Sequence, residues 1–397
     1  MKYGVVIMDG AAGWPLPEMG NRTCLELAGK PNLDLMAREG IVGLVRTVPD
    51  GMEPSSAVAC MSVLGYDPKV YYRGRSGIEA RSLGIPLRDG DVTFRCNLVT
   101  VDDGRMLSYS CGDIKDVDSH PLIAAVQARL GSDHIRFYPG VGYRHILVVG
   151  DGKGLLGAEC TPPHDIPGKP IKDYLPKGPG SGLLCDLMLR SQDVLRDHPV
   201  NRARRRRGEL PASMIWLFWP SGEIPELTPF QRRFGLKAAM SSAVDLLRGL
   251  ARMTGIKVLE IKGVTAGLDN DYAAQATGAL AALSDHDMVI VHIEAPDEAG
   301  HTGRIGDKIA AIESIDREVI GRFREFAKKD WRLLVMPDHP TPIAIRTHCP
   351  DPVPFLAWGD GFGATGAGSF TEAEGRRSQI YIQDGHTLMD RFVGVWQ

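Results

Sequence analysis

One apolar run in the C-terminal half of the chain, Asp287–Pro296, stops abruptly at an acid, Asp297, with His301 four residues further on. Runs of β-branched and apolar residues that end at proline and acids are typical of a buried strand. In an open α/β sheet, ligands bind beyond the carboxyl ends of such strands. If a helical turn follows, Asp297 and His301 face one point, as a carboxylate and an imidazole must to share a divalent cation. The alternative is a helix cap followed by a surface histidine.

The same arrangement occurs a second time. Arg332–Pro337 is again an apolar run, and it leads directly into Asp338 and His339. A single acid and histidine at this spacing is a weak motif, but two copies at the ends of two predicted strands support each other. The sequence therefore predicts a metal site at the carboxyl edge of a sheet.

An N-terminal apolar run, Tyr3–Met8, predicts a further strand that ends at Asp9 and Gly10. An acid at this position, followed by a residue without a side chain, reaches a cation with little backbone obstruction. The alternative is an aspartate that only forms a turn or caps a helix. The pattern then alternates between a predicted helix, Pro31–Gly40, and a predicted strand, Gly43–Val48, which favours a parallel sheet.

Small residues and serines precede an apolar segment in Glu53–Pro68. Ser55 or Ser56 would then lie at a helix N-terminus, where the dipole and free N–H groups stabilise an alkoxide or a phosphate. The alternative is a serine that merely caps the helix. Near the C-terminus, Gly385 and His386 also precede a predicted helix, and by itself His386 indicates only a helix start.

The pattern changes between residues 71 and 231. Glycines punctuate short segments there, and His134–Pro139 with Tyr143–Val149 predicts a hairpin with a basic tip. We expect this stretch to be a separate α+β domain, inserted into an α/β domain made of residues 1–70 and 232–397.

The overall composition excludes several classes of partner. A chain of 397 residues predicts two domains, and its net charge of −3 does not favour binding to nucleic acid or a membrane surface, so we expect a small-molecule partner. No apolar run approaches the roughly 20 residues that span a bilayer, and no signal segment is recognisable, so we expect a cytoplasmic protein. The seven cysteines are scattered singly, as reduced core residues are.

The predicted strand ends and helix starts together supply one constellation of polar groups. Three carboxylates, three imidazoles and one hydroxyl suit two divalent ions bridged by a phosphoryl group. Such ions activate a serine hydroxyl, and the reaction then passes through a covalent phosphoserine. No nucleotide-binding glycine motif precedes a helix. The groups are Asp9, Ser56, Asp297, His301, Asp338, His339 and His386.

These groups lie within longer sequence blocks that extend over essentially the whole chain. The blocks are Asp9-Gly10, Leu64–Pro68, His292–His301, Asp338–Pro342, Thr347–Pro354 and Gly385-His386. Their order resembles the archaeal-type cofactor-independent phosphoglycerate mutases of the alkaline phosphatase superfamily. The blocks Ala-Pro-Asp-Glu-Ala-Gly-His and Asp-His-Pro-Thr-Pro are the most specific parts of the resemblance.

The resemblance implies a mostly parallel α/β sheet flanked by helices, with a smaller inserted α+β domain. It implies a glycolytic enzyme that interconverts 2-phosphoglycerate and 3-phosphoglycerate through a phosphoserine. It also implies two divalent cations, with Mn²⁺ as the leading candidate and Zn²⁺, Co²⁺ or Mg²⁺ as alternatives, and neither bisphosphoglycerate nor a nucleotide. The expected partner is a small phosphorylated substrate, without nucleic acid or membrane, and the expected state is a monomer or small homo-oligomer.

The resemblance further implies roles for single residues. One cation would be held by Asp297, His301 and His386, and the other by Asp9, Ser56, Asp338 and His339. Ser56 would take the phosphoryl group and return it to the neighbouring hydroxyl, while the inserted domain closes and excludes water. Candidates for binding the substrate carboxylate or phosphate are Arg95, Arg144, His145 and Arg248, and the alternative for each is an ion pair within the fold.

The chain departs from the family pattern beside the expected nucleophile. Members usually read Pro-Gly-Ser-Asp-Val-Ala-Asn where this chain has Pro54–Cys60, so Ser56 remains while a carboxylate and an amide are missing. A second difference lies at Thr265–Tyr272. The differences leave two alternatives open, because they can change the acceptor. One is a phosphotransferase or phosphatase for another small phosphorylated metabolite, such as a homoserine-kinase-like enzyme, and the other is a metal-binding homologue without catalysis.

Overall fold

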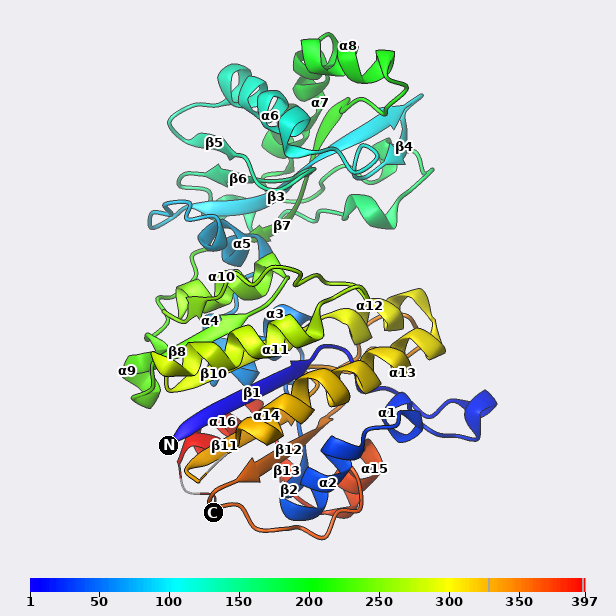
Figure 1. Cartoon of the computed structure of the whole chain (residues 1–397). Helices are drawn as coiled ribbons and strands as arrows, with labels where there is room; N and C mark the ends of the chain where they lie inside the picture. Colours follow the sequence, from blue (N-terminus) through cyan, green and yellow to red (C-terminus); the bar gives the residue numbers. More distant parts are fainter. Residues whose placement is uncertain (328, 395, 397) are drawn as a thin grey trace. The chain divides into compact units, whose positions relative to one another are not determined.

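The structure, a computed structural model, describes residues 1–327, 329–394 and 396 (Figure 1). The described strands form two sheets, one of eight strands and one of five strands. Among the described residues, no helix is both long and apolar enough to cross a membrane.

The chain divides into two compact units. Unit 1 consists of Met1–Tyr72 and Glu226–Gln397, and unit 2 consists of Arg73–Pro225. Unit 2 is therefore inserted into the sequence of unit 1. Whether it closes over a site in unit 1 stays a prediction.

Unit 1 is built on an eight-stranded sheet. In spatial order its strands are β13 (Tyr381–Ile382), β2 (Ile41–Val45), β12 (Val353–Gly359), β11 (Trp331–Met336), β1 (Lys2–Met8), β10 (Met288–Ile293), β8 (Ala238–Ser241) and β9 (Lys257–Val258). Strand β12 runs antiparallel to both of its neighbours, whereas the other pairs are parallel. The predicted mostly parallel α/β sheet is confirmed.

Both faces of this sheet are buried, which explains why its central strands appear in the sequence as unbroken apolar runs. In β10, Val289 and Val291 belong to the core on one face, while Ile290 between them points to the other face and is also fully buried. Figure 1 shows α11, α13 and α14 lying along the sheet.

The helices of unit 1 are short to medium in length. They are α1 (Cys24–Leu27), α2 (Pro31–Glu39), α3 (Ser56–Val63), α4 (Pro68–Tyr71), α9 (Phe230–Phe234), α10 (Asp245–Met253), α11 (Tyr272–Ala281), α12 (Ala295–Thr302), α13 (Ile305–Ser314), α14 (Gly321–Phe326), α15 (Glu372–Arg377) and α16 (Leu388–Val393). A π-helical segment, Ile315–Ile320, joins α13 to α14.

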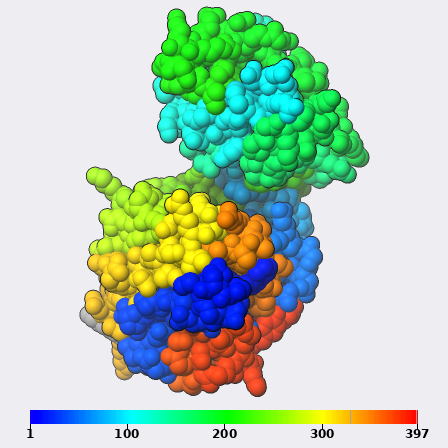
Figure 2. All heavy atoms as spheres, turned by 90° about the vertical axis from the view of Figure 1, so that its right-hand side faces the viewer, coloured from blue at the N-terminus to red at the C-terminus, as the bar shows by residue number. Residues whose placement is uncertain are grey.

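The segment after β1 connects distant parts of unit 1. Thr23 Oγ1 donates a hydrogen bond of 2.7 Å to Glu372 Oε2, and Gly13 N donates to Glu372 Oε1 at 3.1 Å. In Figure 2 this N-terminal segment, in blue, lies at the surface beside the orange and red segments of the C-terminal half. The buried Glu372 therefore fixes the chain directly after the first candidate ligand, Asp9.

Unit 2 has its own antiparallel sheet and core. Its strands are β3 (Val92–Asp102), β4 (Arg105–Ser108), β5 (Ile135–Tyr138), β6 (Arg144–Val149) and β7 (Met214–Ser221). Its helices are α5 (Arg75–Ser82), α6 (Asp116–Leu130), α7 (Ser181–Arg196) and α8 (Pro199–Arg206). Strands β5 and β6 pair antiparallel, so the predicted hairpin is present.

Candidate metal centre

Three neighbouring parallel strands deliver the acids of the candidate site. Strand β1 lies between β10 and β11, and Asp9 follows β1 directly. Asp338 follows β11 by two residues, and Asp297 lies in the first turn of α12 after β10. All three carboxylates are buried, with at most 3% exposure. The topology therefore gathers at one edge three acids that are far apart in the sequence.

Close approach of two of these segments depends on Gly10. Its φ of +60° is left-handed, and a Cβ at this position would lie 2.5 Å from Asp297 Oδ1 and 2.8 Å from Asp297 Cα. Because a side chain would meet backbone as well as carboxylate, only glycine lets the turn after Asp9 pass beside α12.

The first group at this edge consists of Asp9, Asp338 and His339, whose ligand atoms lie within 4.8 Å of one another. His339 Nε2 is 3.5 Å from Asp9 Oδ1 and 3.4 Å from Asp338 Oδ2. Ser56 Oγ lies 3.2 Å from the same nitrogen. The structure thus brings together four of the seven predicted groups.

The structure also separates the two candidate serines. Ser55 is the N-cap of α3, and its side chain accepts a hydrogen bond from Val58 N. Ser56 is the first helical residue, and its hydroxyl points to His339 instead. Ser55 caps the helix, which leaves the Ser56 hydroxyl available to the polar cluster.

The second group is centred on Asp297. His301 Nε2 lies 3.1 Å from Asp297 Oδ2, and His348 Nε2 lies 3.4 Å from Asp297 Oδ1. Asp297, His339 and His348 offer ligand atoms within 4.8 Å of one another. His301 Nδ1 is 2.9 Å from the carbonyl oxygen of Arg346, which orients the ring.

His386, predicted as a ligand, is not part of any of these groups. It lies in the short 3₁₀ turn Gly385–Thr387, which packs beside α3. His348 contacts Asp297 and was not predicted as a ligand. Its signal in the sequence was its place in the block Thr347–Pro354, a few residues beyond Asp338 and His339.

Sequence reasoning also missed three groups around Asp9 and Asp338. His292 Nε2 is 2.7 Å from Asp9 Oδ2, and its Nδ1 is 3.1 Å from Ser242 Oγ. Glu294 Oε2 is 3.8 Å from His292 Nε2, and Cys60 Sγ is 3.5 Å from Asp338 Oδ2. His292 and Cys60 are hidden in apolar runs, where a polar residue is easily read as part of the core.

Several acidic side chains are buried close together in this cluster, and burial disfavours their ionised forms. Burial, reinforced by Asp338 and Glu294, raises the pKa of Asp9 well above its usual range. Burial likewise raises the pKa of Glu294 to about 7. Asp9 Oδ1 has no hydrogen-bond partner although the side chain is fully buried. A buried acceptor without a partner, among carboxylates and imidazoles, fits a divalent cation.

In the second group the pKa of the aspartate is shifted in the opposite direction. Burial acts against the ionised form of Asp297, but hydrogen bonds from His301 and His348 hold its pKa well below the usual range. The same bond to Asp297 raises the pKa of His301 to about 9. A cation bound here must displace protons from these imidazoles, so its affinity falls as the pH is lowered.

A buried lysine connects the loops that carry the first group. Lys308 Nζ in α13 donates to the carbonyl oxygens of Ala12, at 3.0 Å, and Thr341, at 2.8 Å. Thr341 Oγ1 in turn donates to Asp297 Oδ1. Burial lowers the pKa of Lys308, whose side chain is inaccessible to solvent. Lys308 therefore holds the loop after β1 against the loop after β11.

Replacing Lys308 with methionine keeps the apolar stem and removes both hydrogen bonds. We expect the free energy of unfolding to fall by about 2–4 kcal/mol, because two buried carbonyl groups lose a charged donor. We also expect weaker divalent-cation binding, because the two loops are no longer held together. Urea unfolding and metal titration would measure these effects, with the exposed Lys257→Met as control. Unchanged stability and metal affinity in Lys308→Met would contradict this role.

Three of the four predicted substrate-binding residues lie in unit 2. Arg95 is buried and forms an ion pair with Glu79, which Arg75 also contacts at 2.9 Å. Two guanidinium groups against one carboxylate leave one net positive charge. Arg144 is exposed and stacks over the ring of Tyr143.

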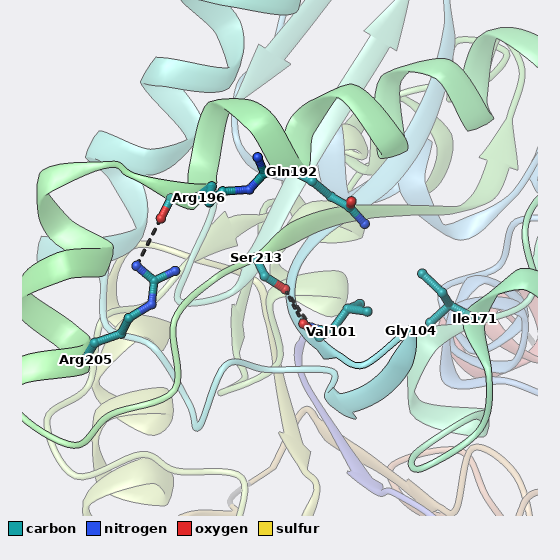
Figure 3. Close-up of a pocket in the computed structure, with 7 residues that line it drawn as sticks. All are labelled: Val101, Gly104, Ile171, Gln192, Arg196, Arg205 and Ser213. Carbon is teal, nitrogen blue, oxygen red and sulfur yellow. Dashed lines mark hydrogen bonds between the residues drawn. The ribbon is translucent and has the colours of Figure 1, made fainter.

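The fourth candidate, Arg248, lies in α10 of unit 1 and forms an ion pair with Glu260. A separate hollow in unit 2 contains none of the four (Figure 3). It is lined by Val101, Gly104, Ile171, Gln192, Arg196, Arg205 and Ser213. The substrate-binding roles of the four residues stay predictions.

His145 is fully buried in β6, and burial lowers its pKa to about 3. An unfolded histidine titrates near about 6.5. Between these values the unfolded chain binds a proton that the native chain does not, so the free energy of unfolding falls as the pH falls through this window.

As the pH falls from about 6.5 to 4.5, we expect the free energy of unfolding to fall less in His145→Gln than in the unsubstituted protein. The difference between the two slopes should be on the order of 1 kcal/mol per pH unit. Urea unfolding across this range would measure the difference. His134→Gln, a change at an exposed histidine of the same unit, serves as control. Parallel pH dependences of the unsubstituted protein and His145→Gln would rule out this contribution.

Comparison with known proteins agrees with this architecture. Residues 37–201 match the model of a family described as 2,3-bisphosphoglycerate-independent phosphoglycerate mutase. Relatives named as this mutase are 44% identical in Methanosarcina barkeri and 46% identical in Methanothrix thermoacetophila, each alignment covering 98% of both chains.

Two solved structures cover nearly the whole chain. The cofactor-independent phosphoglycerate mutase of Thermoplasma acidophilum is 25% identical, with a TM-score of 0.65 over 99% of this chain and 100% of that one. The PH0037 protein of Pyrococcus horikoshii is 26% identical, with a TM-score of 0.82 over 98% and 96% of the two chains. With its sheet topology, its buried acid and histidine cluster and these full-length relatives, the chain belongs to the family of 2,3-bisphosphoglycerate-independent phosphoglycerate mutases.

Proposed function

We propose that this chain interconverts 2-phosphoglycerate and 3-phosphoglycerate without bisphosphoglycerate, and that Ser56 carries the phosphoryl group. The observation that carries this proposal is the position of the Ser56 hydroxyl, 3.2 Å from His339 Nε2 beside the buried carboxylates. The full-length relatives named as this mutase support the substrate and the reaction. They do not favour the alternatives of another phosphotransferase or a non-catalytic homologue.

The cluster has the donors for two divalent cations. Asp9, Asp338 and His339, with Ser56, would hold one, and its carboxylates include the buried oxygen without a partner. Asp297, His301 and His348 would hold the other, and His348 would then take the role that the family resemblance implied for His386. Divalent cations at these positions would lower the pKa of the serine hydroxyl and neutralise phosphoryl oxygens.

The reaction has two matched halves at one serine. Ser56 Oγ loses its proton and bonds to phosphorus while the bond from phosphorus to the glycerate oxygen breaks, and that oxygen takes up a proton. In the second half, the neighbouring glycerate hydroxyl loses its proton and bonds to phosphorus while the bond from phosphorus to Ser56 Oγ breaks, and Ser56 Oγ takes up a proton. The position of Ser56 at the start of α3 favours a phosphoryl group, because free N–H groups and the helix dipole face it.

The proposal is tested with 3-phosphoglycerate as the only phosphorylated compound. The protein is first stripped with a chelator and then reloaded separately with Mn²⁺, Zn²⁺, Co²⁺ or Mg²⁺, and phosphorus NMR follows 2-phosphoglycerate and free phosphate. We expect 2-phosphoglycerate without accumulation of phosphate, and no turnover by the stripped protein. Release of phosphate, or a requirement for added bisphosphoglycerate, would contradict the proposal.

A further inference from the structure

A thiol lies inside the carboxylate cluster. Cys60 is four residues after Ser56 in α3, so the two side chains lie on the same face of the helix. Cys60 is fully buried, and its Sγ is 3.5 Å from Asp338 Oδ2. Cys60, His292 and Asp338 each offer a ligand atom within 4.8 Å of the others, and all three are buried. Sulfur, nitrogen and oxygen donors therefore meet at one point.

An independent observation concerns Asp9, which contacts His292 of this group and has one carboxylate oxygen without a hydrogen-bond partner. Asp9 Oδ2 is 2.7 Å from His292 Nε2, whereas Asp9 Oδ1 is buried without a hydrogen-bond partner. Asp9 also belongs, with Asp338 and His339, to the group assigned above to one cation. The thiol thus contacts Asp338, which is one of the carboxylates that this cation would contact.

We propose that Cys60 Sγ is an additional ligand of the cation held by Asp9 and Asp338, and that it makes this position select Zn²⁺ or Co²⁺ over Mn²⁺ and Mg²⁺. The inference rests on the cation assigned to these carboxylates in the proposed function. A thiolate is a soft ligand that suits Zn²⁺ and similar ions, whereas Mn²⁺ and Mg²⁺ favour carboxylate and water oxygen. When the metal–sulfur bond forms, the S–H bond breaks and its proton is released to solvent.

Other cysteines of the chain provide a matched comparison. Cys349 is also buried in unit 1 and is adjacent in sequence to His348, but its Sγ lies 3.4 Å from Asp351 Oδ2. Asp351 does not belong to any of the four ligand groups found among the described residues. Cys349 is therefore a control: an effect that is seen with Cys60 but not with Cys349 is not a general effect of a buried thiol.

The test loads metal-free protein with Co²⁺ alone and records the near-ultraviolet spectrum. We expect a sulfur-to-cobalt charge-transfer band that Cys60→Ser lacks and Cys349→Ser retains. We also expect Cys60→Ser to lower the affinity for Zn²⁺ by about 10- to 100-fold and the affinity for Mn²⁺ much less. A spectrum without this band in the unsubstituted protein, or the same band in Cys60→Ser, would overturn the inference.

If Cys60→Ser does not fold, alkylation of the cysteines in the unsubstituted protein provides a second test. Bound Zn²⁺ should protect Cys60 from alkylation during limited local opening, with mass spectrometry identifying the labelled peptide, while labelling of Cys349 changes little. Equal labelling of Cys60 with and without Zn²⁺ would overturn the inference. Neither readout requires turnover. A thiolate band without mutase activity would refute only the proposed function. Mutase activity without the band would refute only the ligand role of Cys60.

Discussion

Ser56→Ala will lose mutase turnover by on the order of 10⁴- to 10⁶-fold, the range seen when members of a covalent catalytic unit are removed. The expected cause is the loss of the only hydroxyl placed 3.2 Å from His339 Nε2 among the described residues. Without it, no phosphoserine forms and the phosphoryl group stays on the substrate. Turnover of 3-phosphoglycerate and the mass of the α3 peptide after quenching would measure both effects.

Ser55→Ala is the matched control, because it removes a hydroxyl one residue away that only caps α3. It should cost about 1 kcal/mol of stability, as the loss of an N-cap does, and leave phosphoserine formation in place. If Ser55→Ala abolished the phosphopeptide while Ser56→Ala retained it, the assignment of the nucleophile would be reversed.

His348→Ala will weaken the binding of one of the two proposed divalent cations by about 100-fold or more, because it removes an imidazole 3.4 Å from Asp297 Oδ1. We expect the variant to retain close to one metal equivalent after dialysis, where the unsubstituted protein retains two, and to lose most of its turnover. Elemental analysis and a metal titration would measure the binding.

His386→Ala tests the competing assignment that the family resemblance implied. His386 lies in the turn Gly385–Thr387 and in none of the ligand groups, so its substitution should change metal content and turnover by less than a few-fold. A loss of one metal equivalent in His386→Ala, with normal metal content in His348→Ala, would restore the assignment made from sequence.

Two features made part of the centre predictable. Asp9, Asp297 and Asp338 each follow a strand buried on both faces, and such strands are conspicuous as apolar runs. His301 and His339 are close in sequence to one of these acids. The family resemblance then implied which residues share each cation and that Ser56 is the nucleophile, and the full-length relatives confirm the family.

The residues that sequence reasoning missed are those whose contacts join distant segments. His348 and His386 both follow apolar segments late in the chain, and only the packing of the loop before β12 shows that His348 faces Asp297. His292 and Cys60 lie inside a strand and a helix, where their neighbours are apolar. Lys308 is fully buried in α13, yet on a sequence pattern it reads as a solvated helix residue.

The sequence by itself determined the α/β class, the parallel sheet and the acids at its carboxyl edge, because burial of a strand on both faces and the polar residue at its end are local patterns. The tertiary structure alone decided which hydroxyl faces the cluster, which late histidine joins Asp297 and which thiol approaches Asp338. These choices depend on side-chain direction and on loops that meet across hundreds of residues, and hydrophobic periodicity carries no information about either.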